Sequence, residues 1–282
     1  MKLLLLPNYT KPKTAYAVCR ILTWAQNRSV TVIMEESCSQ ELAMDQRKVV
    51  SWIPHLSPNA LASCDAILTV GGDGTVIHAA HIAAGLMLPL VGINTGTLGF
   101  LAQVSLDNLE ERLEQLYARR YTVEQRAALQ AKWPGGEAPF ALNDIVLQRQ
   151  KLGGLADLNA YHGKELVGRY RADGLVFSTA TGSTAYAYAT GGPIVDPNLD
   201  AIVVSPICPQ NRMNIPLICG MDQSISVMAI NSPMRVLVDG TDLGTLSAGR
   251  KIQVRRSIQI ANMVQFEASW GVLEWQRRIS LL

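Results

Sequence analysis

A glycine-rich segment directly follows one of the most apolar stretches of the chain. Residues 66–70 read Ala-Ile-Leu-Thr-Val, and residues 71–75 read Gly-Gly-Asp-Gly-Thr before a second apolar stretch. Such a loop between a buried strand and a helix can bind phosphate. Its glycines let backbone N–H groups approach the oxygens, and the helix start carries partial positive charge. The loop is therefore a candidate phosphate-binding site.

Asp73 lies in the middle of this loop and is not explained by phosphate binding, because a carboxylate repels an anion. A carboxylate at this position fits either metal attachment or a general base beside an incoming hydroxyl nucleophile, as in a kinase. The alternative is a tight turn in which Asp73 or Thr75 caps the following helix. Both interpretations remain open from this segment alone.

Three more segments have the composition of a ligand pocket. Residues 94–101 (NTGTLGFL) follow a second apolar strand, and we expect them at the same edge of the sheet as the first glycine loop. Polar Asn143 and Asp144 interrupt an apolar strand. Residues 174–195 carry no charge, and within them residues 178–186 (STATGSTAY) offer small hydroxyl groups that could line a nucleotide pocket.

The elements that must position these residues follow two different patterns along the chain. Up to about residue 120, short apolar runs alternate with amphipathic stretches, which predicts an α/β domain with a Rossmann-like parallel sheet. The expected strands are residues 3–6, 30–34, 66–70 and 89–93, and the expected helices are residues 14–27, 76–84 and 106–120. Residues 35–59 fit neither pattern.

From Thr122 onward the hydrophobic pattern changes to period two, with turn clusters between short apolar runs. This predicts a second, mainly β domain of sandwich type over residues 122–256. Hairpin turns are expected at His162-Gly163 and at Asp239-Gly240. The expected strands are residues 140–148, 158–161, 175–179, 201–204, 224–230, 235–238 and 251–255.

Composition excludes several classes of protein. The chain has 282 residues, with 25 Lys and Arg against 23 Asp and Glu, so the net charge of +2 argues against nucleic acid as a partner. The five cysteines are scattered, which indicates a reducing cytoplasm. Residues 74–106 carry no charged side chain, yet Gly85 and Pro89 favour a buried helix and strand over a membrane span.

Taken together, the ordered motifs resemble the NAD kinase family, which phosphorylates the adenosine 2′-hydroxyl of NAD to make NADP. Four blocks match in order and spacing: residues 71–75, residues 94–101, residues 142–147 (LNDIVL) and residues 172–197, which run from ADGLVFSTATGSTAY to GGPIVDP. A single Gly-Gly-Asp-Gly motif is weak evidence, because diacylglycerol kinase-like, sphingoid-base kinase-like and phosphofructokinase-like proteins also carry it. The full set is far more specific.

The resemblance implies a role for each matched residue. Asp73 would accept the proton of the ribose 2′-hydroxyl, and no side chain is implied as a resident metal ligand. The donor would be ATP, another nucleoside triphosphate or polyphosphate, with Mg²⁺ or another divalent cation. The phosphate-binding residues implied are Gly71, Gly72, Gly74 and Thr75. The NAD-binding residues implied are Phe100, Asn143, Asp144, Arg171, Asp173, Thr184, Ala185, Tyr186 and Asp239.

The resemblance also implies an organisation of the chain. The first domain would cover residues 1–121 and be completed by the returning tail, residues 257–282, with the active site between the domains. A homodimer or homotetramer is expected, with a neighbouring subunit near the pocket. Arg171, two residues before an Asp-Gly pair, favours NAD over NADH as the acceptor.

Two other functions remain as alternatives. A lipid kinase of the diacylglycerol or sphingoid-base type would share the Gly-Gly-Asp-Gly loop, although no basic amphipathic membrane helix is evident. A module that senses NAD or NADP without turnover gains slight support from Ala189, where many relatives have a hydroxyl residue. The intact Asp73 favours the enzyme.

Overall fold

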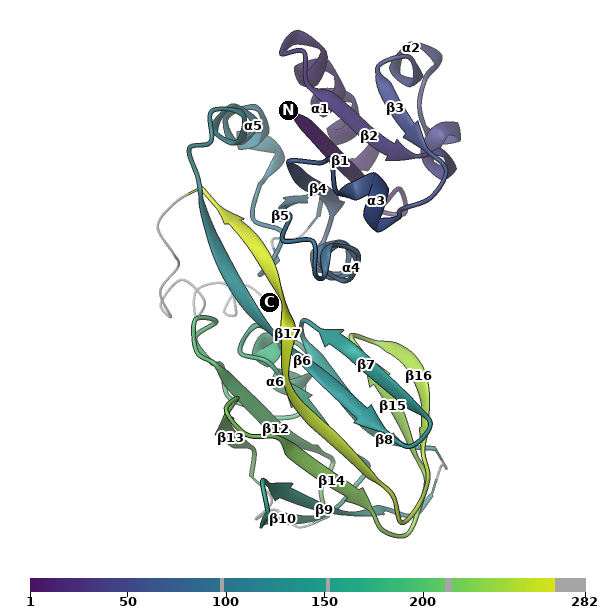
Figure 1. Ribbon diagram of the computed structural model, residues 1–282, viewed down its shortest axis with the longest axis vertical. Helices are drawn as coiled ribbons and strands as arrows, with labels where there is room; N and C mark the ends of the chain where they lie inside the picture. The colour runs from purple at the N-terminus through teal and green to yellow at the C-terminus, as the bar shows by residue number, and fades with distance from the viewer. Residues whose placement is uncertain (97–98, 151–152, 211–214, 267–282) are drawn as a thin grey trace. The chain divides into compact units, whose positions relative to one another are not determined.

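The computed structural model describes residues 1–96, 99–150, 153–210 and 215–266 (Figure 1). The chain divides into two compact units. Unit 1 comprises residues 1–125 and the segment that begins at Ala261, and unit 2 comprises Arg126–Ile260. Most of the tail that was expected to return to the first domain lies outside the described residues, from residue 267 onward.

Unit 1 is built on a parallel sheet in the order β3-β2-β1-β4-β5, and the end of β17 pairs with β5 in parallel. The order reverses at β1, which pairs with β2 on one side and β4 on the other. In such sheets, ligands bind at the carboxyl ends of the strands where the order reverses. The strands are β1 (Lys2–Pro7), β2 (Thr31–Glu35), β3 (Val50–Ile53), β4 (Ala66–Gly71) and β5 (Pro89–Asn94).

Three helices of at least nine residues accompany this sheet, with shorter helical turns between them. The helix expected over residues 14–27 is confirmed, whereas the one expected over 106–120 begins as a 3₁₀ turn and ends at Tyr117. No helix in the described part of the chain is long and apolar enough to cross a membrane. The helices are α1 (Thr14–Asn27), η1 (Glu36–Glu41), α2 (Met44–Arg47), α3 (Pro58–Leu61), α4 (Asp73–Ala83), η2 (Leu106–Asn108) and α5 (Leu109–Tyr117).

Residues 35–59, which the sequence left unassigned, contain the parallel edge strand β3 between short helical turns. Its sequence, VSWI, is largely apolar, but the strand has only four residues and only Val50 is buried. Its partner β2 supplies the hydrogen bonds that define it.

Unit 2 contains two sheets that enclose one core, as expected for a mainly β domain of sandwich type. One has the order β13-β12-β11-β8-β15-β16, and the other contains β10-β9-β14-β17, with β6 pairing with β17 and β7. The strands are β6 (Thr122–Trp133), β7 (Gly136–Ala141), β8 (Asp144–Arg149), β9 (Ala156–His162), β10 (Glu165–Ala172), β11 (Gly174–Ser178), β12 (Ala201–Ile207), β13 (Leu217–Gly220), β14 (Ile225–Ala229), β15 (Met234–Val238), β16 (Thr241–Leu246) and β17 (Lys251–Gln265). Two short helices, η3 (Thr181–Thr184) and α6 (Tyr186–Ala189), follow β11.

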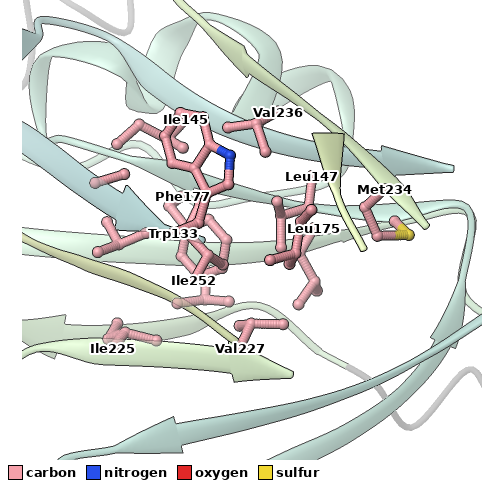
Figure 2. Packing of buried hydrophobic residues seen from close by; sticks show 14 of the residues in the cluster. Trp133, Ile145, Leu147, Leu175, Phe177, Ile225, Val227, Met234, Val236 and Ile252 are labelled. Carbon is pink, nitrogen blue, oxygen red and sulfur yellow. The ribbon is translucent and has the colours of Figure 1, made fainter. Parts of the chain in front are cut away.

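The core of unit 2 lies between these sheets (Figure 2). Ile145 and Phe177 from the six-stranded sheet belong to the same buried cluster as Ile225 and Ile252 from the other sheet. Side chains alternate along β8 and β11, so that Val146 and Val176 belong to a separate buried cluster that includes Ala187 of α6. The strands that lead to the predicted pocket are therefore buried on both faces and firmly held.

The prediction of a single strand over residues 140–148 is wrong. The chain leaves β7 at Ala141 and enters β8, in the other sheet, at Asp144. Between them, the backbone N–H groups of Leu142 and Asn143 donate to the carboxylate of Asp239 instead of to a neighbouring strand. The side chain of Asp239, distant in the sequence, thus takes the place of a neighbouring strand between β7 and β8.

Candidate active site

The two glycine-rich loops of unit 1 leave neighbouring parallel strands at the same edge of the sheet, as expected. Gly71, the last residue of β4, is in register with Asn94, the last residue of β5. The N–H of Thr95 donates to the carbonyl of Gly71 at 3.0 Å. The two loops are thereby held side by side at the carboxyl ends of their strands.

Asp73 is the first residue of α4, and the second loop wraps around its carboxylate. Oδ2 accepts from the backbone N–H of Phe100 at 2.8 Å. Oδ1 accepts from the N–H groups of Leu101 at 2.9 Å and Ala102 at 3.0 Å. Three consecutive backbone donors therefore fix the orientation of this one carboxylate.

Glycine is required where the second loop approaches Asp73, and glycine opens space in the first loop. A Cβ on Gly99 would lie 2.1 Å from Asp73 Oδ1, so no larger residue fits there without displacing the carboxylate. A Cβ on Gly72 or Gly74 would meet no described atom within 4 Å. Space thus remains beside the first turn of α4, where backbone N–H groups lack intrahelical acceptors.

A cavity of about 360 Å³ adjoins this helix start. Its walls include Asn8 and Tyr9, which follow β1, and Gly74 and Thr75 from α4. The Tyr9 hydroxyl oxygen is buried without a hydrogen-bond partner among the described residues, and burial raises its pKa. The size and the position at the reversal of strand order are typical of a nucleotide site.

In unit 2, Asn143 and Asp144 are held by an aspartate in the same way as the second loop of unit 1. Asp239 Oδ1 accepts from the N–H groups of Asn143 at 2.8 Å and Asp144 at 3.0 Å, and its Oδ2 accepts from Leu142 at 2.8 Å. Asp239 lies in the predicted hairpin turn, between β15 and β16. The structure therefore brings three of the predicted NAD-binding residues together.

The surroundings of this cluster disfavour the ionised forms of Asp144 and Tyr186. Burial, and then the negative charge of Asp239, raise the pKa of Asp144 from its ordinary value of 3.8 to about 7. Burial also raises the pKa of the Tyr186 phenol, with smaller contributions from Cys208, Asp144 and Asp173. Tyr186 and Asp173 thus lie close enough to share one electrostatic environment with Asp144.

The remaining predicted residues of unit 2 have different surroundings. Asp173 forms an ion pair with Arg149 at 2.8 Å, whereas exposed Arg171 lies 3.8 Å from Asp157. Thr184 is the last residue of η3 and Ala185 follows it; within η3, a Cβ on Gly182 would lie 2.1 Å from the carbonyl oxygen of Asn143. The η3 segment therefore packs directly on the Asn143 turn.

Sequence reasoning did not identify the residues that support these groups. Thr179 donates its hydroxyl to the carbonyl of Leu142 at 2.7 Å, and its N–H donates to the carbonyl of Asn143 at 2.9 Å. Gly99 and Gly182 provide the close approaches described above. Thr179 and Gly182 belong to the hydroxyl-rich stretch that was expected to line a pocket, but no local pattern reveals their backbone contacts.

Comparisons with known proteins cover both units. Residues 3–121 match the family described as "ATP-NAD kinase N-terminal domain", and residues 142–266 match "ATP-NAD kinase C-terminal domain". A protein named NAD kinase from Heliobacterium modesticaldum is 35% identical over 264 residues, which cover 92% of this chain and 91% of that protein. A protein of the same name from Chlorobaculum tepidum is 30% identical over 270 residues, with 95% and 92% covered.

Two solved structures have the same fold. Yeast NADH kinase, complexed with NADH, has a TM-score of 0.86 at 25% identity, covering all of this chain and 87% of the yeast chain. An NAD kinase from Archaeoglobus fulgidus, in complex with ATP, has a TM-score of 0.78 at 25% identity, with both chains fully covered. The likeness thus extends through both units.

The buried acid pair yields a prediction for stability. Because folding raises the pKa of Asp144, its contribution to stability is complete below about pH 4 and is lost as the pH rises to about 7. Asp144→Asn removes this loss, so we expect the free energy of unfolding to rise by about 1–3 kcal/mol at pH 8.

Urea denaturation at pH 8 and at pH 4 measures the effect, which should disappear at the lower pH. The control is Asp242→Asn on the adjacent hairpin. There the N–H of Gly244 and the charge of Arg235 lower the pKa of the carboxyl, so removing it should give no gain at pH 8. Equal stability of Asp144→Asn and the parent at pH 8 would contradict the prediction.

Proposed function

The chain belongs to the NAD kinase family, and on that premise we propose how its residues transfer the terminal phosphoryl group of ATP to the adenosine 2′-hydroxyl of NAD. The observation that carries the proposal is the fixed carboxylate of Asp73 beside a glycine-lined space at a helix start. Phosphoryl transfer needs alignment and charge stabilisation more than covalent chemistry from the protein. The comparisons do not favour the lipid kinase or the sensor module.

Asp73 acts as the general base for the attacking hydroxyl. Its Oδ2 accepts one backbone N–H and its Oδ1 accepts two, so Oδ2 is the oxygen with more capacity to accept the 2′-hydroxyl proton. Because the loop already holds the carboxylate, little orientational freedom is lost when the substrate binds. The phosphoryl group then moves to the ribose oxygen, and the nucleoside diphosphate leaves.

The donor phosphates bind at the start of α4. Support comes from the open space beside Gly72 and Gly74 and from the positive end of the helix. The adjoining cavity, with Tyr9 and Asn8 in its walls, suits the nucleoside of the donor.

Mg²⁺ enters as part of the ATP substrate and neutralises charge on its phosphates. No three His, Cys, Asp or Glu side chains form a metal-binding group within the described ranges. The residues assigned to the donor are Gly71, Gly72, Gly74 and Thr75.

NAD binds to the residues of the second loop and of unit 2. Asn143 and Asp144 hold ribose hydroxyls, for which an ionised carboxylate and an amide oxygen are suitable acceptors. Phe100 borders the dinucleotide, and Asp173 and Tyr186 contact its rings. The full set assigned to NAD is Phe100, Asn143, Asp144, Arg171, Asp173, Thr184, Ala185 and Tyr186, with Asp239 supporting them.

A cellular setting and an assembly complete the proposal. The five cysteines are free thiols, which suits a reducing cytoplasm. We assign the homodimer or homotetramer that the resemblance implies; Leu199, Ile215 and Ile218 of unit 2 are each more than half exposed and would gain apolar partners in such an assembly. Sedimentation equilibrium should give a mass of two or four chains. A monomer at every concentration would contradict this assignment.

The reaction and the base are tested together by measuring NADP formation from NAD, ATP and Mg²⁺ with an NADP-specific dehydrogenase. The parent protein should produce NADP, whereas Asp73→Asn should lower kcat by roughly 10²–10⁴-fold, the usual contribution of a general base. Calorimetry should show that the variant still binds NAD. Near-normal turnover by Asp73→Asn would refute the assigned base, and NAD binding without NADP from the parent would favour a sensor.

A matched variant separates the base from the loop that holds it, since an asparagine at position 73 also replaces one backbone acceptor with a donor. Gly99→Ala keeps the carboxylate as a proton acceptor but shifts its position, because the new methyl group meets Asp73 Oδ1. We expect a smaller loss of kcat, roughly tenfold, than in Asp73→Asn. Equal losses in the two variants would indicate that loop geometry, and not proton transfer, accounts for the effect.

A further inference from the structure

The hairpin turn at Asp239 directs a carboxylate back onto the start of β8. Asp239 and Gly240 have φ values of 45° and 82°, the left-handed conformations of a tight hairpin turn. Because β15 pairs with β8, with Val238 opposite Ile145, the turn lies beside the residues that precede β8. Its carboxylate accepts the three consecutive N–H groups described above, at 2.8 to 3.0 Å.

The carbonyl side of the same backbone is held as firmly as the amide side. Thr179 binds the carbonyls of Leu142 and Asn143 through its hydroxyl and its N–H, and the N–H of Asp239 donates to the carbonyl of Asp144 at 3.0 Å. The Thr179 hydroxyl in turn accepts from the N–H of Gly182 at 2.9 Å. Asp239 and Thr179 therefore hold the backbone of Leu142 and Asn143, which lie between β7 and β8, and of Asp144, the first residue of β8.

We infer that Asp239 is a positioning residue of the NAD pocket, which fixes the backbone that carries Asn143 and Asp144 and whose charge acts directly on the Asp144 carboxyl. The inference rests on the proposed function, in which these two side chains bind the ribose. Both oxygens of Asp239 already accept backbone N–H groups, so this residue acts through its neighbours. Thr179 shares the positioning role but carries no charge.

The charge of Asp239 also affects how KM for NAD depends on pH, which its hydrogen bonds to the backbone alone would not do. The carboxyl of Asp144 is buried, and after burial the charge of Asp239 from the β15–β16 turn raises its pKa; Asp144 in turn raises the pKa of the Tyr186 phenol from α6. With a pKa of about 7, Asp144 gains its charge as the pH rises through neutrality. Since the ionised form is the better acceptor for ribose hydroxyls, KM for NAD should fall as the pH rises from 6 to 8.

The test measures kcat, KM for NAD and KM for ATP between pH 5.5 and 9 in the parent and in Asp239→Asn. The asparagine loses one acceptor for the backbone and removes the charge beside Asp144. We expect KM for NAD to rise about tenfold at pH 7, KM for ATP to stay unchanged, and the inflection in KM for NAD to shift down by about half a pH unit or more. An unchanged inflection would overturn the electrostatic part of the inference.

Two further variants distinguish positioning from general loss of structure. Thr179→Val removes the hydroxyl but no charge, so it should raise KM for NAD without shifting the inflection. Asp242→Asn on the same hairpin, which removes an exposed partner of Arg235, should change neither quantity. If Asp239→Asn does not fold, Thr179→Val decides the positioning role: an unchanged KM for NAD overturns it.

NADP formation by the parent protein tests the proposed function, whereas the kinetics of the Asp239→Asn variant test the role of Asp239. A parent protein that forms no NADP and binds no NAD by calorimetry contradicts the function itself. A parent that forms NADP, together with an Asp239→Asn variant whose KM for NAD and inflection both match the parent, contradicts only the role of Asp239.

Discussion

An aspartate carboxylate that accepts three consecutive backbone N–H groups is the interaction on which the candidate residues of each unit depend. In unit 1, Asp73 receives the N–H groups of residues 100–102, and in unit 2, Asp239 receives those of residues 142–144. Hydrogen bonds to an ionised acceptor are stronger than those between neutral groups. They hold irregular backbone in place where no strand or helix supplies partners.

The two carboxylates differ in what they do beyond holding backbone. Asp73 lies at a helix start beside open space, and it is on this ground that we propose the same carboxylate as the base. Asp239 is placed to hold the segment behind Asp144, and its charge makes a second, buried carboxyl harder to ionise. The site thus concentrates negative charge in unit 2 at a cost in stability, as functional sites often do.

The sheets explain why these contacts can be so well defined. β4 and β5 of unit 1 are buried parallel strands, and their register places Gly71 beside Asn94. In unit 2, β8 and β11 are buried on both faces, and both sheets contribute to one core (Figure 2). Rigid strands that end at the site leave only short loops to be ordered by side chains.

The sequence alone determined the regular elements whose apolar pattern is strong. The helix over residues 14–27 and the four buried strands of the first sheet follow from hydrophobic periodicity, and the ordered glycine and polar motifs identify the family and its candidate residues. It did not reveal β3, an edge strand of only four residues, of which only Val50 is buried.

Only the tertiary structure decided where strands break and which residues hold the site. Polar Asn143 and Asp144 interrupt the apolar run over residues 140–148, but this pattern does not show that the chain changes sheets there, because the acceptor for the N–H of Leu142 is Asp239, 97 residues away in the sequence. The same applies to Gly99, which is required because the chain returns to within contact of Asp73. Periodicity reports which face of an element is buried, whereas contacts between distant segments depend on the path of the whole chain.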